Sequence, residues 1–229
     1  MKYYQDKNKL YFTHPRADLV GLIADKRGLK VLELGAAGCD TLVELKNRGI
    51  ADEVTGIELF DMPETNQQSE LIDKLIIADI EKHEINLPDN YFDVIICADV
   101  LEHLVDPWAT VRKLATYLKK EGTFILSIPN IQDILSLYKI AVRGDFRYNP
   151  QGGVLDKTHL RFFCKKNAID LLKQGELKVE RVYTNIKFEV PSSKRRIINQ
   201  LTFGLFKRFL AVQYILIAKK DGHAKQNYL

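Results

Sequence analysis

The chain has 229 residues, of which 46% are hydrophobic and 28% are charged, and its formal net charge is only +4. This apolar share is ordinary for a globular protein and is enough for a sizeable core. No apolar run approaches the roughly 20 residues that a membrane-spanning helix needs. The polar, tyrosine-rich start does not have the pattern of a signal peptide, so we expect a cytoplasmic protein.

Strands and helices alternate through the first 130 residues. An apolar strand at 30–34 ends at Gly35 and is followed by a helix over 41–48. A later helix opens at Asp106-Pro107 and is expected to close at Lys119, Lys120 and Gly122. The remaining strands of this part are expected at 53–59, 75–78, 92–98 and 123–128. Such alternation predicts an α/β fold, in which right-handed crossovers build a doubly wound parallel sheet.

The later part of the chain adds two strands and a different kind of loop. Residues 143–164 are rich in Gly, Asp and aromatic residues and are expected to form a lid-like insertion. The other elements expected here are helices at 130–142 and 165–174, strands at 177–182 and 213–219, and a disordered tail at 221–229. We therefore predict one domain over 1–220, with a Rossmann-like, mostly parallel seven-stranded sheet and helices on both faces.

The charge is spread unevenly along the chain. From Lys187 to the end there are nine Lys or Arg against two acidic residues, so the first 186 residues carry −3. Residues 191–211 are expected to form a basic amphipathic helix. This helix either packs over the sheet edge or in a homodimer, or it lies through 194–211 on the inner, anionic face of a membrane. The basic residues are not interleaved with aromatic residues on strands, so we expect no nucleic-acid partner.

Three cysteines stand far apart, at Cys39, Cys97 and Cys164. Their odd number and wide spacing fit neither a disulfide framework nor a metal-binding pattern. We therefore expect reduced thiols and no metal site.

Acidic residues end several strands, where the ligands of such sheets bind. Glu58 ends the second strand, where its carboxylate can accept both hydroxyls of a ribose. Asp79 ends the third strand, where it can accept from an amino group such as that of adenine. The alternatives are a solvated strand end for Glu58 and a capping role for Asp79. Glu33 lies inside the first strand, where an unpaired carboxylate would be costly, so we expect it near the ligand.

The segment after the fourth strand carries further polar residues. Ala98 and Asp99 should line the ligand cleft, with Glu102 and His103 on the next turn. A single histidine at such a place is either a structural hydrogen-bonding group or a catalytic group on the substrate side. The sequence leaves both readings of His103 open.

Taken together, these stretches resemble a known family. The motifs VLELGAAG, TGIE, IIADIE, FDVIICADVLEHLVDPW and GTFILSIPN are similar to those of class I S-adenosylmethionine-dependent methyltransferases, over roughly Tyr3 to Val182. GDFRY at 144–148 and GVLDKTHLRFF at 153–163 resemble a bacterial subgroup associated with the biosynthesis of surface saccharides.

The resemblance implies an enzyme with S-adenosylmethionine as methyl donor and S-adenosylhomocysteine as product. It implies that Glu33, Gly35, Ala36 and Gly38 of the first loop bind the cofactor. It also places Glu58 and Leu59 at the ribose, Asp79 and Ile80 at the adenine, and Cys97, Ala98 and Asp99 at the methionyl side.

The first loop departs from the family pattern at its last glycine position, which is Cys39. A side chain there would stand where the backbone should approach the cofactor. This departure favours an alternative, in which the fold has lost activity and serves as an interaction module.

The same resemblance implies a hydroxyl of a sugar or glycan precursor as methyl acceptor, with another small molecule as the alternative. An alcohol nucleophile benefits from a nearby base. His159 in the DKTH stretch is the candidate base, and Asp156 is the candidate residue that orients it or accepts from a sugar hydroxyl. Alternatively, both residues hold the lid turn to itself.

Overall fold

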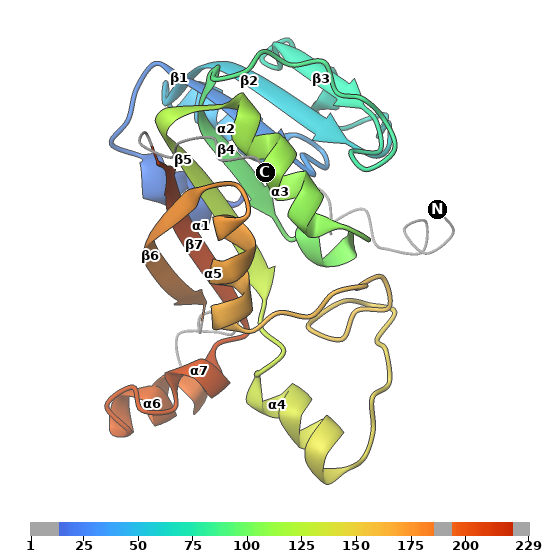
Figure 1. Cartoon of the computed structure of the whole chain (residues 1–229), viewed down its shortest axis with the longest axis vertical. Helices are drawn as coiled ribbons and strands as arrows, with labels where there is room; N and C mark the ends of the chain where they lie inside the picture. Colours follow the sequence, from blue (N-terminus) through green and yellow to red (C-terminus); the bar gives the residue numbers. More distant parts are fainter. Residues whose placement is uncertain (1–13, 186–193, 222–229) are drawn as a thin grey trace, which may run out of the picture.

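The computed structural model describes residues 14–185 and 194–221, and its central feature is a seven-stranded sheet (Figure 1). The strands follow the order β3-β2-β1-β4-β5-β7-β6 across the sheet. Their bounds are β1 Leu29–Leu34, β2 Ala51–Glu58, β3 Lys74–Ile77, β4 Phe92–Ala98, β5 Leu118–Pro129, β6 Leu177–Asn185 and β7 Gln213–Lys220.

Most neighbouring strands of the sheet are parallel. β7 is the exception, since it pairs antiparallel with both β5 and β6. The strand order reverses between β1 and β4, which lie side by side although β2 and β3 separate them in the sequence. This arrangement confirms the predicted Rossmann-like, mostly parallel sheet, and it places the switch point for ligand binding beyond the ends of β1 and β4.

Helices cover both faces because the central strands are apolar on both sides. On one face, Leu32 and Ile95 belong to a core with α3 (Pro107–Tyr117) and α5 (Lys165–Lys173), which lie side by side in Figure 1. On the other face, Val31 and Ile96 belong to a core with α1 (Ala17–Val20) and α2 (Asp40–Asn47). Successive strand residues thus alternate between two cores, as the period of a β-strand requires.

Shorter elements complete the described chain. Single turns occur at η2 (Gly21–Ile23), η3 (Asn66–Gln68) and η4 (Leu101–His103). The helix expected over 130–142 begins later than predicted, as α4 (Ile134–Leu137) followed by the wider turn η5 (Tyr138–Val142). Asp133 caps α4, because its carboxylate accepts from the backbone N–H of Ser136 at 3.1 Å.

The helix that begins at Asp106-Pro107 is shorter than predicted, and the strand after it is longer. α3 ends at Tyr117, and β5 begins at Leu118, which pairs with Phe92. Lys119 and Lys120 therefore lie on the strand rather than at a helix end. The prediction was wrong here because the apolar Leu118 and Phe92 pair across the sheet, which outweighs the helix-ending signal of the basic residues.

The predicted basic helix over 191–211 is two helices in the described part of that segment. They are α6 (Lys194–Leu201) and α7 (Lys207–Leu210). The break follows from Phe203 and Gly204, whose φ angles of 50° and 78° are left-handed and cannot continue a helix. Residues 191–193 and the tail 222–229 lie outside the described residues.

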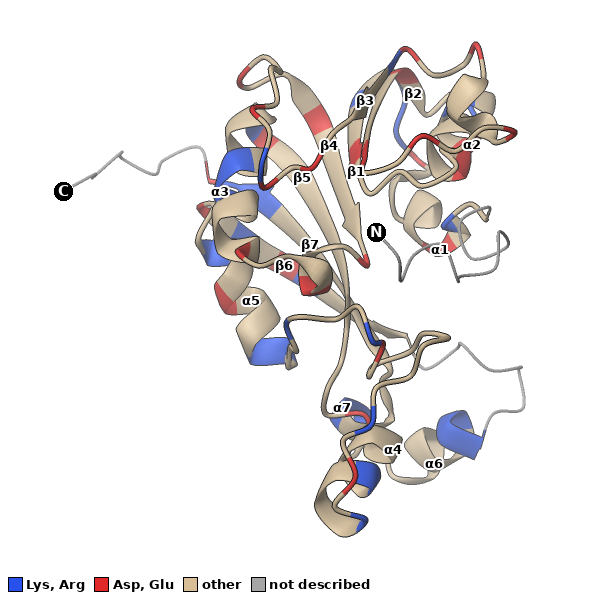
Figure 2. Ribbon diagram, turned by 90° about the vertical axis from the view of Figure 1, so that its right-hand side faces the viewer, with Lys and Arg blue, Asp and Glu red and all other residues tan. Residues whose placement is uncertain are grey.

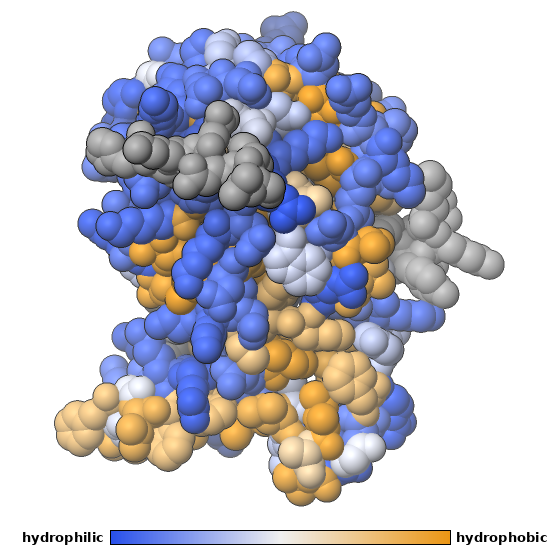
Figure 3. All heavy atoms as spheres, in the orientation of Figure 1, coloured by the Kyte–Doolittle hydropathy of each residue, from blue (hydrophilic) through white to orange (hydrophobic). Residues whose placement is uncertain are grey.

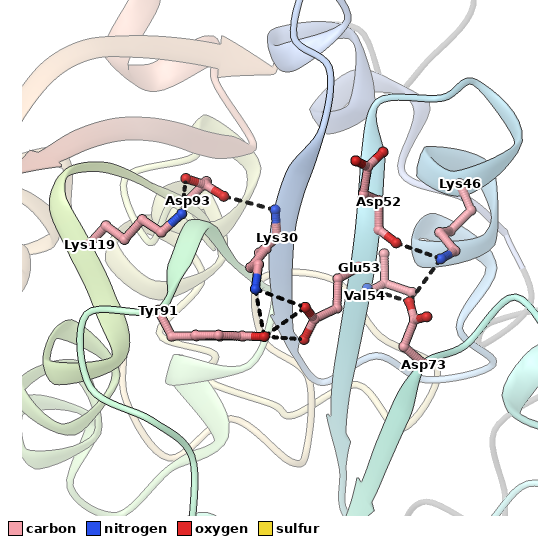
Figure 4. Close-up of polar contacts among 9 residues, drawn as sticks. All are labelled: Lys30, Lys46, Asp52, Glu53, Val54, Asp73, Tyr91, Asp93 and Lys119. Atoms are coloured by element: carbon pink, nitrogen blue, oxygen red, sulfur yellow. Dashed lines mark hydrogen bonds and ion pairs between the residues drawn. The ribbon is translucent and has the colours of Figure 1, made fainter.

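Carboxylates hold the strands together at the edge opposite the switch point (Figure 4). Asp93 accepts from the backbone N–H of Lys30 at 2.9 Å and from Nζ of Lys119 at 2.7 Å. Asp73 accepts in the same way from the N–H of Val54 at 2.8 Å and from Nζ of Lys46 at 2.9 Å. Each acid therefore satisfies a backbone N–H of a strand. Asp93, on β4, joins β4 to β1 and β5, and Asp73, just before β3, joins β2 to α2.

We expect Asp93→Ala to lower the free energy of unfolding by about 1–3 kcal/mol, because it leaves the Lys30 N–H without its acceptor. Asp52→Ala is the matched control. Asp52 is exposed, and its carboxylate makes no hydrogen bond to the described residues, so we expect a change within about 0.5 kcal/mol. Urea unfolding followed by circular dichroism measures both values. Equal losses in the two variants would contradict this role of Asp93.

Candidate functional site

A cavity of about 730 Å³ opens beyond the carboxyl ends of β1, β2, β3 and β4. The loop after β1 and the ends of the other three strands form one part of its wall. η4 and the loop 143–164 form another part, with Gly153, Val154, Asp156 and His159 from that loop. The cavity therefore lies at the switch point, as the topology requires.

The loop after β1 lies against the cavity with its backbone. Gly35 has a φ of 74°, and a Cβ on it would overlap a methyl group of Val100. Only glycine fits this close approach between the first loop and the segment after β4. Ala36 and Ala37 also line the cavity.

Cys39 does not reach the cavity. Its φ is 65°, and its side chain is fully buried in the core between β1, α1 and α2. The left-handed conformation turns the thiol away from the ligand side of the loop, so the expected intrusion of Cys39 is wrong. Gly38 is also buried and does not line the cavity, where Ala37 stands instead.

Glu58 connects the end of β2 to the first loop. Its Oε2 accepts from the N–H of Ala37 at 2.8 Å, and its Oε1 accepts from the N–H of Leu59 at 2.7 Å. Burial raises the pKa of this carboxyl above its usual value, although the hydrogen bonds from the backbone oppose that rise. Glu58 and Leu59 both line the cavity. The two backbone N–H donors therefore fix the carboxylate of Glu58 in the cavity wall, where a ligand can contact it.

Glu33 lines the same cavity from inside β1. It is only 3% exposed, and its Oε2 has no hydrogen-bond partner among the described residues. Burial raises the pKa of Glu33 to about 8, and the positive charge of Arg16 only partly opposes this rise. Glu33 therefore lies on the ligand side of the sheet, as expected from the sequence.

At the end of β3, Asp79 lines the cavity together with Ile80. Its carboxylate accepts from the N–H of Glu81 at 3.0 Å and from Nζ of Lys82 at 2.6 Å. Because these donors lie in the same turn, Asp79 has the capping contacts that the sequence left as an alternative. A ligand that binds Asp79 would have to share the carboxylate oxygens with these two donors.

At the end of β4, the side chains of Cys97 and Ala98 face opposite ways. Ala98 and Asp99 line the cavity, whereas Cys97 is fully buried in the core with α3 and α5 and does not. The expectation that Cys97 contacts the cofactor is therefore not supported by its position. The period of the strand explains it, because neighbouring side chains point to opposite faces.

Asp99 belongs to a network that the sequence did not predict. Arg16 Nη1 donates to Asp99 Oδ2 at 2.5 Å, and its Nη2 donates to Ser127 Oγ at 3.1 Å. The side-chain amide of Gln213 also donates to Asp99. Arg16 and Gln213 line the cavity although they lie far from β4 in the sequence, and no local pattern marks them.

The opposite part of the wall brings the candidate acceptor-side residues together. His103 and His159 lie edge to face, with ring centroids 4.7 Å apart, and Nε2 of His159 lies 3.9 Å from Oε1 of Glu102. Burial raises the pKa of Glu102 well above its usual range, and the charge of Asp99 adds to this. Asp156 accepts from the N–H and the hydroxyl of Thr158, at 2.9 and 2.8 Å, so it does hold its own turn.

Comparison with known proteins gives the following matches. A sequence model of a family described as "Methyltransferase domain" matches residues 5–182. The chain is similar to the Ubiquinone biosynthesis O-methyltransferase of Neisseria meningitidis serogroup C (strain 053442), with 33% identity over 123 residues, which are 50% of each protein. The chain thus spans about half the length of the curated relatives it matches first.

Two solved structures share the fold at low identity. An S-adenosylmethionine-dependent methyltransferase from Archaeoglobus fulgidus superimposes with a TM-score of 0.60 and 18% identity, over 89% of this chain and 90% of the other. The 1,6-didemethyltoxoflavin-N1-methyltransferase of Burkholderia thailandensis, with bound 1,6-didemethyltoxoflavin and S-adenosylhomocysteine, superimposes with a TM-score of 0.57 and 16% identity, over 90% of this chain and 76% of the other. At such identities the likeness concerns the fold alone.

The raised pKa of Glu33 predicts a pH-dependent stability. The unfolded chain loses this proton near pH 4.5 and the folded chain only near pH 8, so the free energy of unfolding decreases as the pH rises between these values. Glu33→Gln removes this titratable group, so we expect the free energy of unfolding to decrease less across that pH window. Urea unfolding at several pH values measures it, with the exposed Glu84→Gln as control. Identical pH slopes for Glu33→Gln and the unaltered chain would contradict the prediction.

Proposed function

The chain belongs to the methyltransferase domain family, and we propose that it methylates a hydroxyl group of a sugar or glycan precursor. At the level of the family, the prediction of a methyltransferase is confirmed. S-adenosylmethionine-dependent methyltransferases share the fold, which supports the predicted cofactor. The observation that carries the proposal is one cavity with two chemically different parts. Buried acids and a glycine loop face one part, and two histidines with Glu102 face the other.

The first part fits the cofactor. Gly35 lines the cavity with backbone alone, since a Cβ there would overlap Val100. Oε2 of Glu33, which has no hydrogen-bond partner among the described residues, is available to a cationic or hydrogen-bonding group. We assign the ribose hydroxyls to Glu58, whose two oxygens are oriented by Ala37 and Leu59. The adenine would lie by Asp79 and Ile80, and the methionyl end by Ala98 and Asp99.

The bound cofactor would supply an electrophilic sulfonium methyl group. Little covalent chemistry is then left to the protein, which has to position the acceptor and exclude water. In this proposal His159 receives the proton of the acceptor hydroxyl, since its ring lies in the wall of the cavity and is only 6% exposed. His103 packs against it and keeps it in place.

Two other acceptor assignments compete with the sugar. The relatives named for ubiquinone biosynthesis favour a hydroxyl of a ubiquinone precursor, since they are O-methyltransferases that match half of this chain. The sugar is favoured by the resemblance of residues 144–163 to the saccharide subgroup. The alternative of an inactive interaction module loses its main support, because Cys39 lies in the core and does not enter the cavity.

We further propose that the protein works at an anionic membrane surface. No helix of the described residues is long and apolar enough to cross a bilayer. However, Leu201, Phe203 and Leu205 are 73%, 100% and 76% exposed. Figure 3 shows apolar surface over α4, α6 and α7, and Figure 2 shows Lys and Arg on α6 and α7. Exposed apolar and basic residues together are typical of an interfacial contact.

The function is tested by methyl transfer from labelled S-adenosylmethionine to a panel of nucleotide sugars, lipid-linked glycans and ubiquinone precursors. We expect a methylated sugar. Glu58→Ala is the cofactor control, and its dissociation constant for S-adenosylmethionine should rise at least about 30-fold, since two charge-assisted hydrogen bonds are lost. Calorimetry measures this binding. Unchanged affinity would contradict the ribose assignment, and transfer to the ubiquinone precursor alone would contradict the sugar.

The membrane contact is tested by co-sedimentation with vesicles that contain anionic lipids. Phe203→Asp should lower the bound fraction about tenfold, because a fully exposed aromatic ring no longer inserts. Leu71→Asp makes the same charge change at an exposed apolar residue near β3 and should leave binding unchanged. If the two variants bind alike, the exposed residues of α6 and α7 do not contact the membrane, and a homodimer through this surface becomes the better reading.

A further inference from the structure

A second chemical feature of the cavity is the cluster of Glu102, His103 and His159. One potential ligand atom from each residue lies within 4.8 Å of the other two. Glu102 and His159 are buried, and His103 is half-buried. We propose that this cluster binds a divalent transition-metal cation at the acceptor side of the cavity.

Glu102 supplies the strongest argument. It is 1% exposed, and neither of its carboxylate oxygens has a hydrogen-bond partner among the described residues. The 3.9 Å between its Oε1 and Nε2 of His159 is too long for a hydrogen bond. An acid buried without a partner is costly, and a cation between these groups would satisfy it.

The two histidines are oriented as metal ligands are. Nδ1 of His159 lies 3.0 Å from the carbonyl oxygen of Val154, and Nδ1 of His103 lies 3.1 Å from that of Thr158. A carbonyl accepts only, so each Nδ1 is the donor, and the lone pair of each neutral ring is on Nε2. Ligating histidines typically donate their other ring N–H to a backbone carbonyl in this manner.

Backbone contacts keep the cluster together although its members come from two segments. The carbonyl oxygen of Glu102 accepts from the N–H of Leu160 at 2.8 Å and from the N–H of Arg161 at 3.0 Å. These bonds join η4 to the loop 143–164 next to His159. The site is therefore formed by the fold itself and does not depend on side chains alone.

The donor set indicates the class of metal. Two imidazoles and one carboxylate suit Zn²⁺, Mn²⁺, Fe²⁺ or Co²⁺ better than Mg²⁺ or Ca²⁺, which prefer oxygen ligands. With metal–ligand bonds of about 2.0–2.2 Å, ligand atoms stand roughly 3–3.5 Å apart, so binding would draw the observed atoms together by about 1 Å. Three protein ligands leave coordination positions for an oxygen of the acceptor.

Such a cation would lower the pKa of a bound hydroxyl. This role, unlike the binding of the metal, rests on the proposed function. Held as a ligand, His159 would no longer accept the proton of the acceptor hydroxyl, which would leave to water instead.

The test uses the untagged full chain after treatment with a chelator, titrated with Co²⁺ and Zn²⁺. We expect one cation per chain, with visible Co²⁺ bands of nitrogen and oxygen ligation and no thiolate charge-transfer band. Glu102→Gln and His159→Asn should each weaken binding at least about 30-fold, since each removes a ligand. His83→Asn is the control, because His83 is exposed and lies outside the cluster, and it should bind within twofold of the unaltered chain.

Circular dichroism and S-adenosylmethionine binding verify the fold of each variant, and His103→Asn replaces any variant that fails. Absence of one-to-one binding, or equal binding by the cluster variants and His83→Asn, overturns the proposal. The readout needs no acceptor. A chain that binds the metal but methylates no sugar would refute only the proposed acceptor, and a chain that methylates a sugar without binding metal would refute only the metal site.

Discussion

The geometry of the cavity depends on the carboxylate of Glu58. It lies at the last position of β2 and accepts from the backbone of two separate segments, Ala37 in the loop after β1 and Leu59 in the loop after β2. A parallel sheet brings the carboxyl ends of its strands to one edge but leaves the loops beyond them unpaired. One buried acid joins two of these loops, and the same acid lines the cavity. One side chain therefore supports both loops and, in the function proposed above, also recognises the ligand.

Much of this arrangement could be predicted from the sequence, since it follows from local patterns. The strands that alternate between two cores are largely apolar, and two of the acids that line the cavity, Glu58 and Asp79, end or closely follow such strands. The period of a strand then decides which neighbour faces the ligand. Ala98 and Cys97 differ in this respect although they are adjacent, because β4 places Cys97 in the core.

The remaining features depend on contacts between distant segments, which no local pattern reports. Arg16 contacts Asp99 and Ser127 across more than 80 residues of sequence, and Gln213 reaches the same acid from β7. Cys39 differs from its predicted position for another reason. Its effect depends on a left-handed φ of 65°, which residue type does not determine and which turns its thiol into the core. Backbone conformation in tight loops is thus the point at which prediction from residue types fails.

Two buried acids, Glu33 and Glu102, are costly features of the unliganded fold. Each has at least one oxygen without a hydrogen-bond partner among the described residues, and each lies in the cavity wall. A carboxyl group that only supported the fold would be better replaced by an apolar residue of similar size. Their positions differ, with Glu33 beside the glycine loop and Glu102 beside the histidines. A ligand that satisfies a buried polar group recovers part of its desolvation cost, so in the function proposed above a methyl donor beside Glu33 and an acceptor, with or without a cation, beside Glu102 would each offset the cost of one buried acid.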